Sequence, residues 1–230
     1  MLYNGLYAIA RNAIRMLPEE TMLQKYQSAV YMGSFREDVE YFPVIHRVTQ
    51  HHSFTHLTGP RIPGGYIPLI WPGPVWKARK YYEKAIGEFE KGHVAQSFVD
   101  LGRVSHILTD MACPNHVNRV IHENLDRYEV YLEKHEKELS EISPPKVSYN
   151  QSIKELVMGL CRFTQGFPVD RTNNPMGRLF KKMGLLKSQP RSALIEQARA
   201  IFPVAVAYNV ALFEKFLLDT GVRERKQSGL

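Results

Sequence analysis

A histidine and an aspartate, His106 and Asp110, lie four residues apart in a stretch whose apolar residues recur with a helical period. Positions i and i+4 share one helix face, one turn apart, so the imidazole and the carboxylate project side by side. Such a pair can bind one metal ion, as other helical i, i+4 pairs do. The alternative is an ion pair that only decorates the helix. The choice depends on which other ligands the fold brings to this pair.

The same stretch ends in a proline that is followed by another candidate ligand. Pro114 predicts the end of the helix or a bend in it. His116 comes two residues later, where a reversal of the chain would aim its imidazole back towards Asp110. Cys113 directly precedes the proline. A single cysteine in such surroundings is more often a small packing residue than a ligand, so we expect Cys113 to pack in the core.

More histidines and acids stand on both sides of this stretch. They are Asp38, His51, His52 and His56 upstream, and His122, Asp126 and Glu129 downstream. The downstream three occupy positions i, i+4 and i+7, which form one helix face. The alternative for them is a solvated acidic face. Imidazole and carboxylate ligands suit zinc or a similar divalent ion, so the sequence predicts a metal site with almost no cysteine.

Helices are expected to position these residues. Apolar periodicity and intervening breakers predict helices at residues 3–16, 18–32, 75–91, 93–112, 117–139, 152–167 and 191–219. Gly33 is expected to end the second helix, and a short helix or turn at 34–42 carries Asp38. Gly102 lies inside a predicted helix, where glycine costs about 1 kcal/mol relative to alanine. Its presence there suggests close packing of a neighbouring helix.

Two segments are loop-like. Residues 46–74 are dense in proline and glycine and contain His52 and His56, which predicts a long surface loop that shapes a site. Residues 168–190 are irregular, with a basic helical turn. No alternating run is long enough to demand a sheet. We therefore predict an all-α, single-domain helical bundle over residues 1–230, with a disordered tail at about 221–230.

Composition narrows the class of protein. The 230 residues are 44% hydrophobic and 23% charged, as in an ordinary globular domain. No apolar run approaches the roughly 18–20 residues of a membrane helix, so we expect no transmembrane segment. The start lacks the pattern of a signal peptide and the two cysteines give no disulfide framework, which favours the cytoplasm. The net charge of +7 favours polyanionic partners, such as an anionic membrane surface or nucleic acid.

These motifs resemble the zinc-dependent phospholipase C family, which is related to the fungal zinc-dependent single-strand nucleases. The central resemblance runs through residues 98–116, with Leu101-Gly102, then His106-x-x-x-Asp110, then Pro114-x-His116. The flanking resemblances are Asp38 with Ser53-Phe54-Thr55-His56 upstream, and Arg127-Tyr128-Glu129 downstream. Together they cover most of residues 30–135. The resemblance implies a mostly helical fold that holds up to three zinc ions.

The resemblance also implies which residues bind the ions. The first ion would take Asp38, His106, Asp110 and a loop histidine, either His56 or His52. The second would take His116, Glu129 and a further histidine. The family places that histidine four residues before the glutamate, where this chain has Leu125. His122 is the available substitute and Asp126 the second choice.

The third zinc site departs further from the family pattern. The family binds this ion through the amino terminus of a mature tryptophan, a nearby histidine and the bridging aspartate. This chain begins with Met1 and has no histidine before His46. We therefore expect two zinc ions, with the third site altered or absent.

The expected activity is hydrolysis of phospholipid headgroups or a related phosphodiester by a metal-activated water. Asp38 would act as a ligand or as the proton acceptor. Two alternatives stay open at this point. One is a nuclease for single strands on the same scaffold, which aromatic stacking platforms would favour. The other is a non-catalytic protein that zinc only stabilises.

Overall fold

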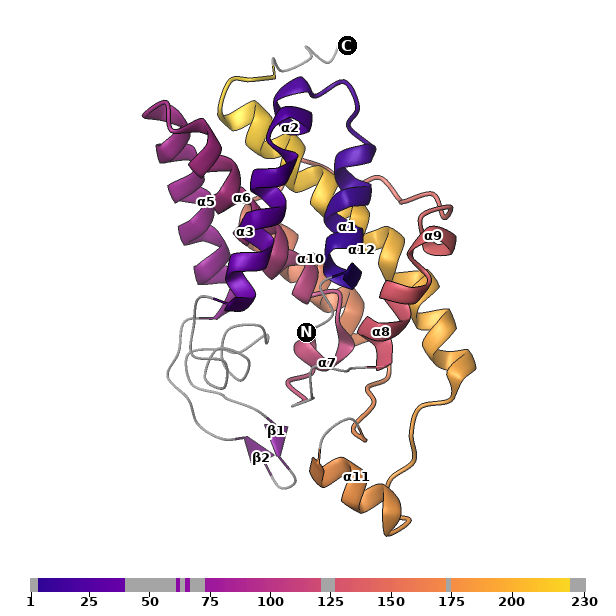
Figure 1. Ribbon diagram of the computed structural model, residues 1–230. Helices are drawn as coiled ribbons and strands as arrows, with labels where there is room; N and C mark the ends of the chain where they lie inside the picture. The colour runs from indigo at the N-terminus through magenta and orange to yellow at the C-terminus, as the bar shows by residue number, and fades with distance from the viewer. Residues whose placement is uncertain are drawn as a thin grey trace.

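The computed structural model describes residues 4–39, 61–62, 65–66, 73–120, 127–172 and 175–223. The N-terminal part contains α1 (Asn4–Arg15), α2 (Thr21–Lys25), α3 (Gln27–Val39), α5 (Pro74–Glu90) and α6 (Val94–Asp110). Next come α7 (Pro114–Val117), α8 (Arg127–Lys134), α9 (Glu136–Leu139), α10 (Ile153–Gln165), α11 (Pro175–Lys182) and α12 (Arg191–Asp219). Two short strands, β1 (Arg61–Ile62) and β2 (Gly65–Tyr66), pair antiparallel. The predicted all-α class is confirmed (Figure 1).

The long helix α12 runs across the bundle, and α1, α6, α8 and α10 pack against it (Figure 1). Phe202, Phe213 and Phe216 of α12 are fully buried in the hydrophobic core. By length and composition α12 could cross a membrane, a property that the sequence reading missed. However, 67% of its most apolar 18-residue window is buried inside the fold, as in the core helix of a soluble protein.

Helices α3 and α6 touch backbone to backbone. A Cβ atom added to Gly102 would lie 2.0 Å from the carbonyl oxygen of Val30, and one added to Gly33 would lie 1.8 Å from that of Val99. Only glycine permits such an approach. The close packing expected at Gly102 is confirmed. The prediction that Gly33 ends a helix is wrong, because α3 continues through it to make this contact.

Two predicted helices are divided in the structure. The helix expected at residues 18–32 is α2 followed by α3, with a turn at Tyr26. The helix expected at residues 117–139 is α8 and α9, separated at His135. The break predicted at Pro114 is confirmed, since this proline lacks an amide hydrogen and starts α7. The predicted disordered tail lies mostly outside the described residues.

Buried hydrogen bonds hold the C-terminal half of α6 against α12. Ser105 Oγ donates to Asn209 Oδ1 at 2.6 Å, and Asn209 Nδ2 donates to Thr109 Oγ1 at 3.3 Å. All three side chains are almost fully buried. Because buried polar groups are costly to separate from their partners, these bonds fix the rotation of α6 where His106 and Asp110 emerge.

The contact between α3 and α6 predicts opposite effects for two glycine-to-alanine substitutions. Gly102→Ala should lower the free energy of unfolding by about 2 kcal/mol, because the new methyl group overlaps a backbone carbonyl. Gly87→Ala, in α5, should raise it by about 0.5–1 kcal/mol, because nothing lies within 4 Å of the added Cβ. Urea unfolding measures both. Equal stability of the two variants would contradict the backbone contact.

Candidate metal centre

The C-terminal end of α6 carries the first two candidate ligands. Nε2 of His106 lies 3.3 Å from Oδ2 of Asp110, one turn further along the helix. Both side chains are only 1% exposed. The i, i+4 pair therefore faces inward and not to solvent, so it is not a decoration of the helix surface.

The turn after α6 brings a second imidazole to the same carboxylate. The amide of Cys113 donates to the carbonyl oxygen of Asp110 at 3.0 Å, which reverses the chain before Pro114 starts α7. Nδ1 of His116 then lies 3.4 Å from Oδ1 of Asp110. Each oxygen of the Asp110 carboxylate thus faces one imidazole.

Glu129, in the first turn of α8, completes the described cluster. Its Oε1 atom lies 3.5 Å from Nε2 of His116. His116 therefore has a carboxylate beside each ring nitrogen. Histidines that bind a metal through one nitrogen commonly donate the other N–H to a carboxylate or carbonyl, so either nitrogen of His116 is suited to ligation. The structure brings together four predicted ligands, His106, Asp110, His116 and Glu129.

The spacing of these atoms fits a metal centre. N–H···O hydrogen bonds are most often about 2.9–3.0 Å long. Two ligand atoms on a tetrahedral zinc ion, each about 2.0–2.1 Å from it, are separated by about 3.3–3.4 Å. The separations of 3.3, 3.4 and 3.5 Å, which join three different pairs of atoms, are each close to this value. The residues present therefore fit zinc both in donor type and in spacing.

Cys113 packs in the hydrophobic core as predicted, and its thiol also lies beside the cluster, which the sequence did not predict. One ligand atom each from Cys113, His116 and Glu129 lies within 4.8 Å of the others. Cys113 is 2% exposed. Sequence reasoning missed it because the available signal, a cysteine three residues before a candidate histidine, is weak without the turn at Pro114. Thiolate, imidazole and carboxylate are all zinc ligands.

The cluster attracts positive charge. Burial alone would lower the pKa of His116, but the charges of Cys113 and Asp110 and hydrogen bonds to both raise this pKa well above its ordinary value. Such surroundings favour a cation at this position, whether it is a proton on the ring or a bound metal ion. Buried anionic groups without a nearby cation would be strongly destabilising.

The structure does not describe the side chains of five predicted site residues. His52, His56, His122 and Asp126 lie outside the described residues, as does the side chain of Asp38. The backbone of Asp38 lies in the last turn of α3. Helices α3 and α6 run in the same direction (Figure 1), and Ser34 Oγ donates to the Gly102 carbonyl at 2.9 Å. Asp38 and His106 each follow one turn after this contact.

A network of hydrogen bonds next to the cluster anchors the start of α8. Arg127, two residues before Glu129, donates from Nη1 to Oδ2 of Asp170 and to the Gln189 carbonyl, each at 2.9 Å. Burial would raise the pKa of Asp170, but hydrogen bonds from Thr172 and the Arg127 guanidinium lower it overall. Asp170 is therefore held as a carboxylate that anchors the start of α8.

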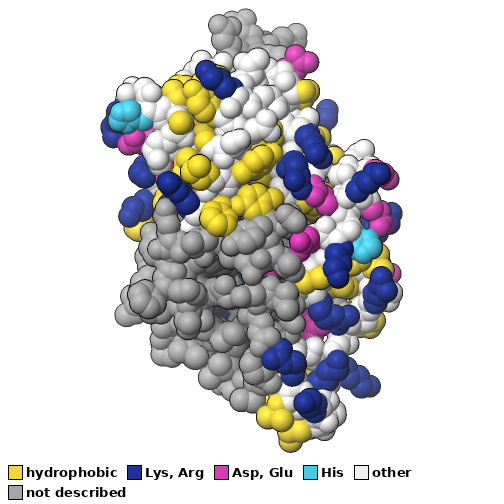
Figure 2. Space-filling model, viewed as in Figure 1, with side chains coloured by type: hydrophobic (Ala, Val, Ile, Leu, Met, Phe, Trp, Pro, Cys, Tyr) yellow, Lys and Arg dark blue, Asp and Glu magenta, His cyan; other side chains and the backbone are white. Residues whose placement is uncertain are grey.

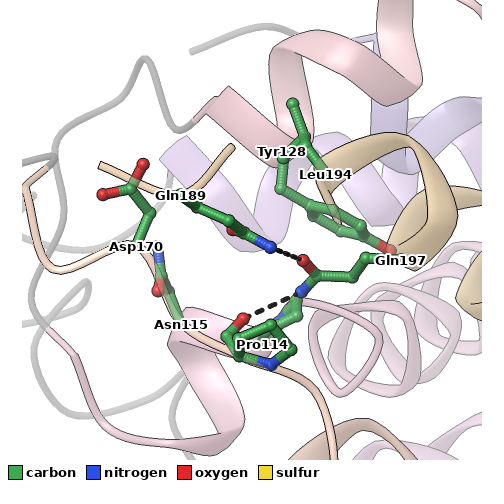
Figure 3. A pocket seen from close by; sticks show the side chains of 8 residues that line it. Pro114, Asn115, Tyr128, Asp170, Gln189, Leu194 and Gln197 are labelled. Atoms are coloured by element: carbon green, nitrogen blue, oxygen red, sulfur yellow. Dashed lines mark hydrogen bonds between the residues drawn. The ribbon is translucent and has the colours of Figure 1, made fainter. Parts of the chain in front are cut away.

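The same network reaches α12. Gln189 donates to Gln197 at 2.6 Å, and Gln197 donates to the Pro168 carbonyl at 3.1 Å. Figure 3 shows these side chains around a small pocket whose other walls include Asn115 of α7 and Tyr128 of α8. Asn115 and Tyr128 are the immediate chain neighbours of His116 and Glu129. Pro168, Asp170, Gln189 and Gln197 therefore line the same pocket as the chain neighbours of His116 and Glu129.

Comparison with known proteins agrees with the residues of this cluster. The sequence profile of the family described as "Zinc dependent phospholipase C" matches residues 7–154, which include every predicted ligand. The chain belongs to this family. Its members are zinc-dependent hydrolases, and the resemblance first seen in residues 98–116 is confirmed. A comparison with curated protein sequences finds no match.

Two solved structures share the fold. The alpha-toxin of Clostridium perfringens, from avian strain SWCP, aligns with a TM-score of 0.65 and 15% identity over 98% of this chain and 65% of that one. The alpha toxin of Clostridium absonum aligns with a TM-score of 0.63 and 15% identity over 97% of this chain and 67% of that one. This chain thus spans about two thirds of the length of each toxin chain.

Two buried aspartates of α6 provide a test of the metal centre. Asp110→Asn should lower the zinc content of the purified protein, because a neutral amide replaces the charged carboxylate between the two imidazoles and binds zinc more weakly. Asp100→Asn is the matched control. Asp100 is equally buried on the same helix, but Lys84 and Gln96 hydrogen-bond to its two oxygens.

Elemental analysis measures the zinc content, and circular dichroism checks that both variants remain folded. A folded Asp110→Asn protein that keeps the zinc content of the unmodified chain would contradict a metal centre at this carboxylate.

Proposed function

We propose that this protein is a zinc-dependent phosphodiester hydrolase that acts on phospholipid headgroups or a related phosphate ester. The observation that carries the proposal is the Asp110 carboxylate, buried between His106 and His116 at ligand-like distances. The family supplies the general reaction class. The substrate is inferred from the family, whose description names a phospholipase C.

The proposed centre has two metal positions on either side of Asp110. The first combines His106 and Asp110 with Asp38 and one loop histidine, His52 or His56. The second combines Cys113, His116 and Glu129, with His122 or Asp126 as a further ligand. Zinc bound there would polarise a phosphoryl oxygen and lower the pKa of a bound water to about 7.

The placement of α3 supports the role proposed for Asp38. The Ser34–Gly102 contact sets the register of α3 against α6, so Asp38 and His106 stand at the same level of two neighbouring helices that run in the same direction. A carboxylate at that level would reach the first metal position or accept a proton from the attacking water. The close backbone contact at Gly33 and Gly102 would hold the two residues at a fixed separation.

A histidine substitution tests the hydrolytic activity. His106→Ala should lower the hydrolysis of a chromogenic phosphodiester by more than about a hundredfold, since losing even a second-shell partner of a metal ligand typically costs 10–100-fold. His93→Ala is the control, because its side chain is 64% exposed at the opposite end of α6. Chelation should abolish the activity of the unmodified protein, and added zinc should restore it. Activity that survives both chelation and His106→Ala would contradict the proposal.

A cysteine substitution tests the second metal position. We expect the cobalt-substituted protein to show a sulfur-to-cobalt charge-transfer band in the near ultraviolet, and Cys113→Ser should remove it because a hydroxyl replaces the thiolate. Cys161→Ser, at the other buried cysteine, should leave the band unchanged. His122→Ala, analysed in parallel, tests the ligand expected from the sequence. Absence of the band from the unmodified protein would show that Cys113 is not a ligand.

A further inference from the structure

The segment between Asp170 and Glu196 has an unusual charge pattern. It contains no acidic residue, and its six basic residues are Arg171, Arg178, Lys181, Lys182, Lys187 and Arg191. Among the described residues, none forms an ion pair with Lys181, Lys182 or Lys187. The segment thus carries positive charge with no acid of its own to balance it, and its three lysines are not neutralised by described neighbours.

The same segment exposes apolar side chains. Leu179, Met183 and Leu185 are 51%, 61% and 64% exposed, which makes them the three most exposed large apolar residues of the described chain. Along α11 and the turn after it, Leu179, Phe180 and Met183 follow an i, i+1, i+4 pattern and share one side. Lys181 and Lys182 lie on the other side. We call residues 175–187 the α11 arm.

The α11 arm has a defined local structure. Gly184, with φ of +74°, ends α11: its amide donates to the Lys181 carbonyl at 3.0 Å, and the Leu185 amide donates to the Phe180 carbonyl at 2.9 Å. These are the two bonds of a Schellman motif. At the other end, Gly177 packs against the backbone of Arg171, with no room for a side chain. The exposed leucines and methionine are therefore presented on an ordered element.

The α11 arm projects from the body at the end of the molecule that holds α7 and α8 (Figure 1). Figure 2 shows dark-blue basic side chains beside yellow apolar ones at this tip. Asp170 and Gln189, which lie before and after the arm in the chain, both accept hydrogen bonds from Arg127, two residues before Glu129. A surface bound by the arm would lie at the same end of the molecule as the cluster.

We propose that the α11 arm binds the surface of an anionic phospholipid membrane. A short helix with lysines on one side and aliphatic residues on the other suits the membrane interface, where the apolar side chains enter the acyl boundary and the lysines meet anionic headgroups. A single-stranded nucleic acid would also complement the charge, but it stacks on exposed aromatic rings. The most exposed apolar residues here are aliphatic. The inference rests on the proposed function for its purpose, but its test measures binding alone.

Co-sedimentation of the zinc-loaded 230-residue chain with lipid vesicles tests the inference. We expect binding to vesicles of equimolar phosphatidylcholine and phosphatidylserine, and much weaker binding to phosphatidylcholine alone or at high salt. Lys181→Glu/Lys182→Glu should weaken binding by about tenfold or more. Leu179→Ser/Met183→Ser/Leu185→Ser should weaken it to a similar extent, because it removes the inserted apolar groups.

Matched controls separate the arm from overall charge and hydrophobicity. Lys146→Glu/Lys154→Glu changes the net charge equally at two exposed lysines elsewhere, and Met16→Ser removes another exposed methionine. Both controls should bind vesicles like the unmodified protein. All variants should hydrolyse a soluble chromogenic phosphodiester at the unmodified rate, because none of these residues belongs to the metal cluster.

Vesicle binding that is the same in the arm variants and the controls would overturn the inference, even if the protein hydrolyses the soluble ester. Arm-dependent vesicle binding without hydrolysis would support the inference and contradict the proposed function. Tight binding of a single-stranded oligonucleotide that is lost in the lysine variant but kept in the apolar variant, together with no vesicle binding, would assign the arm to nucleic acid and overturn the lipid proposal.

Discussion

The site depends on the contact of the buried Asp110 carboxylate with the imidazoles of His106 and His116. A carboxylate that is 1% exposed is costly to bury unless cationic charge lies nearby. The fold places one imidazole at each of its oxygens, His106 at one and His116 at the other. The Cys113 thiol and the Glu129 carboxylate lie beside His116. This arrangement gathers more negative than positive charge in one place. A divalent cation bound there would neutralise it, so the charge of the cluster favours a metal ion.

The surrounding helices restrict the movement of this cluster in different ways. Asn209 of α12 fixes the rotation of α6 through buried hydrogen bonds, while α3 packs on the opposite side with backbone contacts at two glycines. Arg127 fixes the start of α8 through Asp170 and the Gln189 carbonyl. The candidate ligands therefore come from separately anchored pieces of chain, each held by contacts outside the cluster.

The sequence predicted the local parts of this site and missed the tertiary parts. The spacing of His106 and Asp110 and the break at Pro114 follow from helix geometry, so both could be inferred without a structure. The cluster role of Cys113 could not, because it depends on how tightly the chain turns after α6. Gly33 shows the same limit: its type indicates either a helix end or a close approach, and only the partner helix decides between them. The anchoring of Arg127 by Asp170 joins residues 43 positions apart and leaves no local pattern.

The backbone contact between α3 and α6 has a mechanical consequence. Most helix pairs are separated by side chains that can change rotamer, which lets one helix slide against the other when the protein fluctuates. Here a carbonyl oxygen of each helix contacts a glycine of the other, so few side chains lie between the two main chains at this point. Thermal motion would therefore carry Asp38 and His106 together as one rigid unit, and distortions of the bundle would be absorbed at other helix interfaces.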